Sequence, residues 1–108
     1  MTKSVSSDAV TVKVTLRHSN NHGSIEDYAR EAVSGLTKYY PGLLNCHVIL
    51  DHQKHEHDQN KLAEITVHVP QHDLVARESA PTYEQGIDRC IDNLARQLKK
   101  LKDKQSDF

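Results

Sequence analysis

The chain has 108 residues, a formal net charge of −1 and 27% charged residues, which suits one small domain with a single core. No apolar run approaches the roughly 20 residues of a membrane span. The start, MTKSVSSDAV, lacks the apolar stretch of a secretory signal, so we expect neither feature. Two cysteines, Cys46 and Cys90, are too few for a disulfide framework, and we expect buried thiols in a reducing cytoplasm.

Residues 9–17 alternate between apolar and polar side chains, which is the period of a strand with one buried face. The polar stretch HSNNHGS ends this strand as a loop. A helix follows, for which Ser24 and Asp27 resemble a capping box and Pro41-Gly42 provides the stop. Its apolar face has helical spacing and comprises Ile25, Tyr28, Ala29, Ala32, Val33, Leu36 and Tyr40.

Three further strands are predicted at residues 46–50, 62–69 and 73–79, of which the last has the weakest pattern. In the middle one, alternation places Ala63, Ile65, Val67 and Val69 inward, and Pro70 closes the strand. The hydrophilic segment DHQKHEHDQNK is predicted to be a hairpin loop with solvated strand ends. This spacing favours an antiparallel meander, whereas the first strand joins through a helical crossover and can lie parallel to a neighbour.

A second helix is predicted to run to Lys104, with Pro81 in its first turn, where the missing N–H would be unpaired anyway. Its continuous apolar stripe comprises Tyr83, Ile87, Cys90, Ile91, Leu94, Leu98 and Leu101. The element order is therefore β-α-β-β-β-α. We expect an α+β fold of two layers, a four-stranded sheet with both helices packed on one face. Residues 9–104 form this single domain, between a flexible N-terminus at 1–8 and a short tail at 105–108.

Positive charge is concentrated at the end of the second helix, where five of the nine residues from Arg96 to Lys104 are Lys or Arg. At about 100° per residue, the residues opposite the apolar stripe are Arg89, Asn93, Arg96, Lys100 and Lys104, flanked by Lys99 and Lys102. One interpretation is a solvated helix face whose cations suit the negative end of the helix dipole. The other is a surface for nucleic-acid phosphates. With no aromatic residue in this run, such a surface would bind backbone and shape rather than stacked bases.

The second helix, read from Tyr83 to Lys104 as Tyr-x-x-x-Ile-Asp-x-x-Ile-Asp-x-Leu-x-Arg-Gln-Leu-x-Lys-x-Lys-Asp-Lys, resembles the C-terminal helix of a known family. That family is the bacterial ribosome hibernation-promoting factors, which include the ribosome-associated inhibitor and are also called sigma-54 modulation proteins. The segments LVARESAPTYEQGID, SIEDYARE and LTKYYPGLLNCHVIL are similar to further parts of the family, so the resemblance runs from about Val10 to Lys104.

The resemblance implies the same β-α-β-β-β-α fold and a role without catalysis or cofactors in the cytoplasm. Family members bind the 30S subunit, or the 70S ribosome, between head and body, and there they block mRNA and tRNA. Such factors act in the stress response and in stationary phase. By matching position, the resemblance implies contacts with 16S rRNA by Arg96, Lys100, Lys102 and Lys104, with Arg89, Lys99, Arg77 and Lys38 as further candidates.

Some positions depart from the family pattern. The first helix is about one turn shorter than usual, Asn93 stands where a lysine is common, and Leu101 interrupts a Lys-His-Lys pattern. Because the chain ends shortly after Lys104, we expect it to lack the additional domain of the long members that pairs two ribosomes. A short member would need a separate dimerising factor or would silence single ribosomes.

A different interpretation is that a diverged domain of this fold binds a protein partner or a metal ion. His52, His55 and His57 are the candidate ligands, but zinc needs three or four converging ligands, and a polar hairpin tip explains the histidines better. Because histidine titrates near pH 6.5, histidines could instead strengthen RNA binding between about pH 8 and 6. Tyr39 and Tyr40 could stack on bases, although packing at the core or its rim explains them better.

Overall fold

The computed structural model describes residues 11–17, 23–38, 45–53 and 60–105. None of the helices in these ranges is long and apolar enough to cross a membrane. The elements follow the predicted order, with a short 3-10 helix, η2, added after the first helix. They are β1 (Thr11–Leu16), α1 (Gly23–Ser34), η2 (Gly35–Lys38), β2 (Asn45–His52), β3 (Lys61–Val69), β4 (His72–Ala80) and α2 (Tyr83–Gln105).

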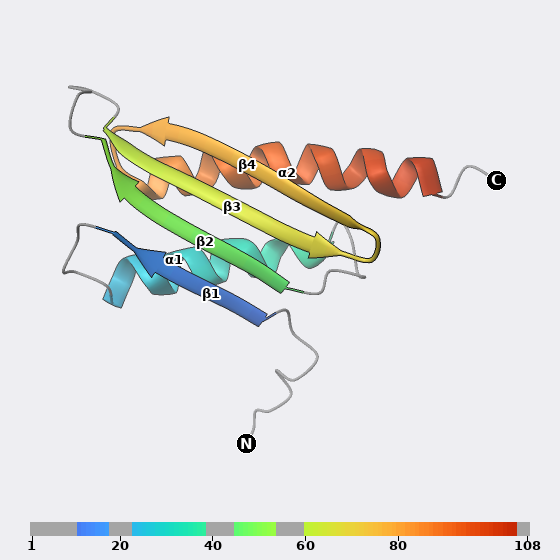
Figure 1. The fold of residues 1–108 in the computed structure, drawn as a ribbon, viewed down its shortest axis with the longest axis horizontal. Coiled ribbons are helices and arrows are strands. Elements are labelled where there is room, and N and C mark those ends of the chain that lie inside the picture. Colours follow the sequence, from blue (N-terminus) through green and yellow to red (C-terminus); the bar gives the residue numbers. More distant parts are fainter. Residues whose placement is uncertain (1–10, 18–22, 39–44, 54–59, 106–108) are drawn as a thin grey trace, which may run out of the picture.

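The four strands form one sheet in the order β1-β2-β3-β4. β1 is parallel to β2, and the β2-β3 and β3-β4 pairs are antiparallel, as the sequence predicts. Both helices lie on the same face of this sheet, α1 on the β1 side and α2 over β3 and β4 (Figure 1). They also run in the same direction, so their C-terminal ends point toward the same end of the molecule (Figure 1).

The core lies between the sheet and the two helices. Alternate residues of β2 and β3 are buried, and α2 contributes Ile87, Cys90, Leu94 and Leu98, all of which are fully buried. Burying each large aliphatic side chain of this kind contributes about 1.5–3 kcal/mol. No polar or charged residue in the described part of the chain is buried. At the start of α2, a Cβ on Gly86 would lie 3.2 Å from the Ala63 Cβ, so glycine permits the close approach of helix and sheet.

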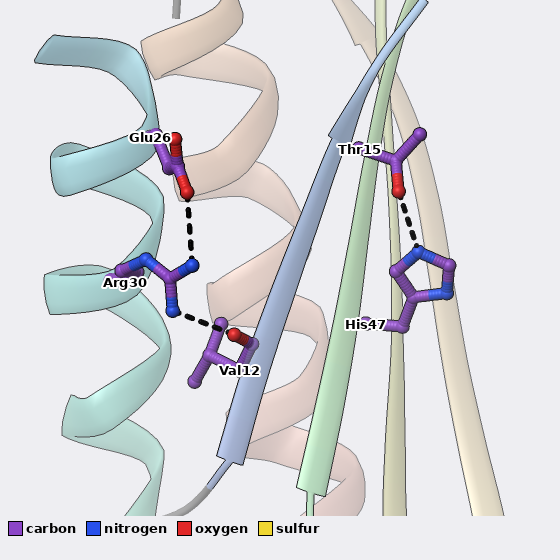
Figure 2. A network of polar contacts seen from close by, with 5 residues as sticks. All are labelled: Val12, Thr15, Glu26, Arg30 and His47. Carbon is purple, nitrogen blue, oxygen red and sulfur yellow. Dashed lines mark hydrogen bonds and ion pairs between the residues drawn. The ribbon is translucent and has the colours of Figure 1, made fainter. Parts of the chain in front are cut away.

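Side chains of the helices cap backbone carbonyls of both outer strands. On the β1 side, Arg30 of α1 donates a hydrogen bond of 2.6 Å to the Val12 carbonyl and another of 2.9 Å to Glu26 (Figure 2). On the β4 side, Arg89 of α2 donates to the Ser79 carbonyl at 2.6 Å, and Gln97 donates to the Val75 carbonyl at 3.2 Å. Capping of this kind occupies strand edges that would otherwise be open to pairing with another chain.

Three details of the predicted helices are wrong. α1 begins at Gly23, so Ser24 lies inside the helix instead of preceding it. α1 ends at Ser34, and from Gly35 the chain continues as the tighter 3-10 helix η2. α2 begins after Pro81, because Thr82 is its cap: the Thr82 hydroxyl accepts a hydrogen bond of 3.1 Å from the Gln85 N–H.

The two cysteines are confirmed as buried, free thiols. Burial raises the pKa of both Cys46 and Cys90 to about 12, because a thiolate loses its hydration in the core. Neither thiol is therefore suited to act as a nucleophile.

Candidate nucleic-acid interface

The last ten residues of α2 carry five exposed cations, which we call the basic half of α2: Arg96, Lys99, Lys100, Lys102 and Lys104. The buried stripe of the helix fixes their direction, because Leu94 and Leu98 face the sheet and hold the opposite side in solvent. Within the described residues, no hydrogen bond or ion pair holds the ammonium groups of the four lysines. These lysines are free to pair with an anionic ligand.

Arg96 forms an ion pair with Asp92 one turn earlier in the helix, at 3.1 Å. Both side chains are highly exposed, 71% for Arg96 and 72% for Asp92. An exposed pair of this kind typically stabilises by less than about 1 kcal/mol. Arg96 is therefore a surface cation that a phosphate can recruit, and it is not committed to the interior.

Lys100 and Lys104 line a shallow groove between the end of α2 and the start of β4, where His72 and Leu74 form the opposite side. Lys100 also borders a second depression, shared with Arg96 and Lys99. Lys100 thus lies at the centre of the positive surface. Lys102 is about 160° around the helix from Lys100, so the structure spreads the five cations over two flanks of α2.

The remaining candidate residues occupy different positions. Arg89 is exposed, but its guanidinium donates to the Ser79 carbonyl and so supports the β4 edge. Arg77 is an exposed residue of β4 opposite Glu64, on the sheet face that carries no helix. Lys38 ends η2, which lies against α2, and its side chain is outside the described atoms. The structure therefore brings together Arg96, Lys99, Lys100 and Lys104 around two depressions that share Lys100, and it separates Lys102 and Arg77 from them.

Negative charge gathers at the opposite end of the helical layer. Exposed or half-buried carboxylates of α1 and the first half of α2 comprise Glu26, Asp27, Glu31, Glu84, Asp88 and Asp92. Of these, Glu26 and Glu84 lie in the first turns of α1 and α2, where the helix dipole favours an anion, and the parallel arrangement of the helices (Figure 1) brings these two turns to the same end. The helical layer therefore has an acidic end and a basic end, which a net charge of −1 conceals.

Two residues with a place on the helical side of the molecule were not predicted from the sequence, one beside the basic half of α2 and one between the helices. His72 faces Lys100 and Lys104 across the groove because the two-residue turn Pro70-Gln71 reverses the chain there, and Val69 pairs with His72. Tyr28 is half exposed, and its hydroxyl donates a 2.6 Å hydrogen bond to Asp88 of α2. The turn dipeptide was a usable signal for the first residue, whereas only the packing of α1 beside α2 reveals the second.

Among the described histidines, His47, His52 and His68 each have a polar side-chain partner, which is Lys61 Nζ at 3.0 Å in the case of His52. His47 lies 3.0 Å from the Thr15 hydroxyl on the open face of the sheet (Figure 2), and His68 lies 2.7 Å from Asp73. In the described part of the chain, no group of three or more His, Cys, Asp or Glu side chains could hold a metal ion. His55, His57, Tyr39 and Tyr40 lie outside the described residues.

The sequence and the fold both have matches among known proteins. A family model described as "Sigma 54 modulation protein / S30EA ribosomal protein" matches residues 12–106. The chain belongs to this family. The family assignment confirms the resemblance seen in the sequence, and it makes the protein a relative of ribosome-associated factors.

Relatives of this S30EA family chain include a protein named "Ribosome hibernation promoting factor" from Acidithiobacillus ferridurans. The two are 32% identical over 77 residues, which cover 71% of this chain and 97% of the relative. The structure matches the Thermus thermophilus Protein Y N-terminal domain with a TM-score of 0.72 and 26% identity, covering 85% and 98% of the two chains. A ribosomal subunit interface protein from Coxiella burnetii shares the fold, with a TM-score of 0.70, 16% identity and coverage of 86% and 98%.

Proposed function

We propose that this S30EA family protein is a ribosome hibernation factor that binds the 30S subunit, alone or within the 70S ribosome. It would occupy the mRNA and tRNA channel, contact 16S rRNA and inhibit translation by occupancy. Family membership supports the ribosome as partner. The observation that carries the RNA contact is the basic half of α2, whose exposed lysines have no partner in the described part of the fold.

Physical chemistry favours phosphate binding at this surface. Each cation that neutralises an rRNA phosphate releases a condensed counterion, so several cations on one helix give strong, sequence-independent affinity. Arg96 and Lys100 provide the centre of the surface, and Lys104 extends it along the groove toward His72. Docking by charge and shape requires neither a cofactor nor catalysis.

The proposed cellular role follows from the ribosome as partner. The protein would act in the cytoplasm during the stress response and in stationary phase, when translation is silenced. Pairing of two ribosomes would be the task of a separate dimerising factor. A variant role, as a protein-binding or metal-binding module, would replace this proposal if the purified protein bound no ribosomes and took up zinc stoichiometrically.

The test is charge reversal of the basic half of α2. We expect the variant Arg96→Glu/Lys100→Glu/Lys104→Glu to lose association with 30S particles at least tenfold while retaining its circular dichroism spectrum. Sedimentation with purified subunits, together with inhibition of cell-free translation, measures the effect. Phosphates that attract the native helix would repel the variant.

A matched control keeps the change in charge but moves it to the other face of the molecule. Lys13→Glu/Arg17→Glu alters two exposed cations of the open sheet face, and it is compared with Lys100→Glu/Lys104→Glu. The control should bind 30S particles nearly as well as the native protein. Sedimentation of the triple variant at the native level would refute the assignment of the surface.

A further inference from the structure

A second surface feature lies outside the basic half of α2. α1 and α2 border a groove of about 470 Å³, which we call the inter-helix groove. Its apolar part is formed by Ala32 of α1 with Ile91 and Ala95 of α2, all partly buried against the core. Its polar part is formed by three exposed carboxylates, those of Glu31, Asp88 and Asp92.

The groove exists because small side chains meet where the helices pack. Alanine at positions 32 and 95 leaves space that larger residues would fill. The hydrogen bond of 2.6 Å from the Tyr28 hydroxyl to Asp88 ties the helices together at one side and holds the Tyr28 ring as a wall. This bond raises the pKa of Tyr28 to about 12.

The chemistry of the groove excludes several occupants. Three carboxylates repel phosphates, so the groove is unsuited to rRNA. Among the residues that the structure describes, no cluster of three ligands could hold a metal ion. The groove is open to solvent, whereas small-molecule sites bury most of the ligand. An elongated partner with apolar and cationic side chains matches it best.

We propose that the inter-helix groove binds a lysine- or arginine-rich peptide segment, which packs one apolar side chain on Ile91. Its cations pair with Glu31 and with Asp92, whose exposed ion pair with Arg96 they replace. From Asp88 to Ala95 the groove follows two turns of α2, or roughly 10 Å, which is the span of a short amphipathic segment. Only the source of the segment, a protein of the small ribosomal subunit, rests on the function proposed above.

The first test uses a defined probe. A synthetic 14-residue peptide with leucine and lysine at helical spacing is titrated into the isotope-labelled full chain, and amide chemical shifts are followed by NMR. We expect shifts at Tyr28, Ala32, Ile91 and Ala95. Glu31→Gln/Asp92→Asn should raise the Kd about tenfold, and Asp73→Asn/Asp103→Asn, with the same loss of charge elsewhere, should change it less than twofold.

Further variants sharpen this result. Ala95→Lys, which fills the groove and adds a cation, should abolish the shifts, whereas Lys100→Glu/Lys104→Glu should leave peptide binding in place. Shifts confined to other surfaces, or equal losses in both carboxylate variants, would overturn the proposal. Movement of the same resonances with protein concentration alone would identify a second copy of the chain as the occupant, which also overturns it.

The second test compares protein-free 16S rRNA with whole 30S subunits. Glu31→Lys/Asp92→Lys adds positive charge, so electrostatics alone predict tighter binding to both. The groove proposal predicts tighter binding to the free RNA but at least fivefold weaker binding to the subunit, because a cationic protein segment is now repelled. Tighter binding to both would exclude a subunit protein as the source. Failure of the native chain to bind subunits would remove the proposed function and leave the peptide result standing.

Discussion

Gln71 has an unusual backbone conformation, with φ at 70°, in the left-handed region that L side chains disfavour. It is the second residue of the two-residue turn between β3 and β4. The turn sets the pairing of Val69 with His72 and so places His72 beside the end of α2. The strained backbone of Gln71 therefore belongs to the turn that places His72 at the candidate RNA surface.

Glycine tolerates this conformation without a steric penalty, so Gln71→Gly should raise the free energy of unfolding by about 0.5–1 kcal/mol. The same substitution at Gln85, an exposed residue within α2, is the control and should lower stability by roughly 0.5–1 kcal/mol. Denaturant unfolding measures both variants. A loss of stability in Gln71→Gly would show that the glutamine side chain contributes more than its backbone conformation costs.

Tyr28 of α1 and Asp88 of α2 form a hydrogen-bonded pair that connects the two helices. The hydrogen bond to Asp88, with smaller effects from burial and from the nearby carboxylates, raises the pKa of Tyr28 from 10.0 to about 12. The folded value lies above the unfolded one, so the contribution of this pair to stability is complete below about pH 10. It is lost as the pH rises through about 12.

Asp88→Asn removes the negative charge that opposes ionisation, and the pKa of Tyr28 should fall toward 10.0. The difference in tyrosinate absorbance between each protein and its Tyr28→Phe counterpart isolates this titration from the other tyrosines. Asp92→Asn is the control, because Asp92 pairs with Arg96 and does not bond Tyr28. An unchanged titration in Asp88→Asn would contradict the assigned cause.

At the scale of elements, α2 performs two separable tasks. Arg89 and Gln97 support the β4 edge by donating to the Ser79 and Val75 carbonyls, whereas the exposed cations of the second half face solvent. Helical spacing alone placed Arg89 and Lys100 together among the residues opposite the apolar stripe of α2. The sheet edge distinguishes them, because it lies within reach of Arg89.

Arg89→Ala should therefore lower the free energy of unfolding by about 1 kcal/mol, the typical contribution of a hydrogen bond at an exposed site. Lys100→Ala should change stability by less than about 0.5 kcal/mol and weaken 30S binding more than Arg89→Ala does. Thermal unfolding and subunit sedimentation on both variants give the comparison. Stronger loss of binding in Arg89→Ala would place this guanidinium on the RNA.

β1 and β3 were predictable because their alternation follows directly from burial of one face, and β2 was predictable as a short apolar run. The first residue of α2 was not predictable from the sequence, because proline is tolerated both in a first helical turn and just before a cap. Only the bond between the Thr82 hydroxyl and the Gln85 N–H decides between these positions. Among the candidate site residues, helical spacing correctly exposed Arg96 and Lys100 but gave no sign that Arg77 lies on the opposite face.

The whole molecule is nearly neutral but electrically polar, with carboxylates along α1 and the first half of α2 and cations at the end of α2. Such a molecule approaches an anionic surface in one orientation, with the acidic end away from the phosphates. Net charge is therefore a poor guide to its partners. Local charge determines the orientation, and salt should control the affinity.

If about four phosphates are neutralised, the logarithm of the rRNA association constant should fall with the logarithm of salt concentration with a slope of roughly −3 to −4. Lys100→Ala should make the slope less steep by about 0.7–0.9. Lys13→Ala, on the open sheet face, should leave it unchanged. Fluorescence anisotropy at several salt concentrations gives the slopes, and a slope near zero for the native protein would contradict phosphate binding.

The sequence by itself determined the order of the elements, the buried faces and the basic end of α2, because each depends on periodicity within one segment. The tertiary structure decided which of these cations share a surface, which one supports the sheet edge, and that an acidic groove lies between the helices. Such properties depend on distances between segments far apart in the chain, and local patterns of apolar and charged residues do not encode those distances.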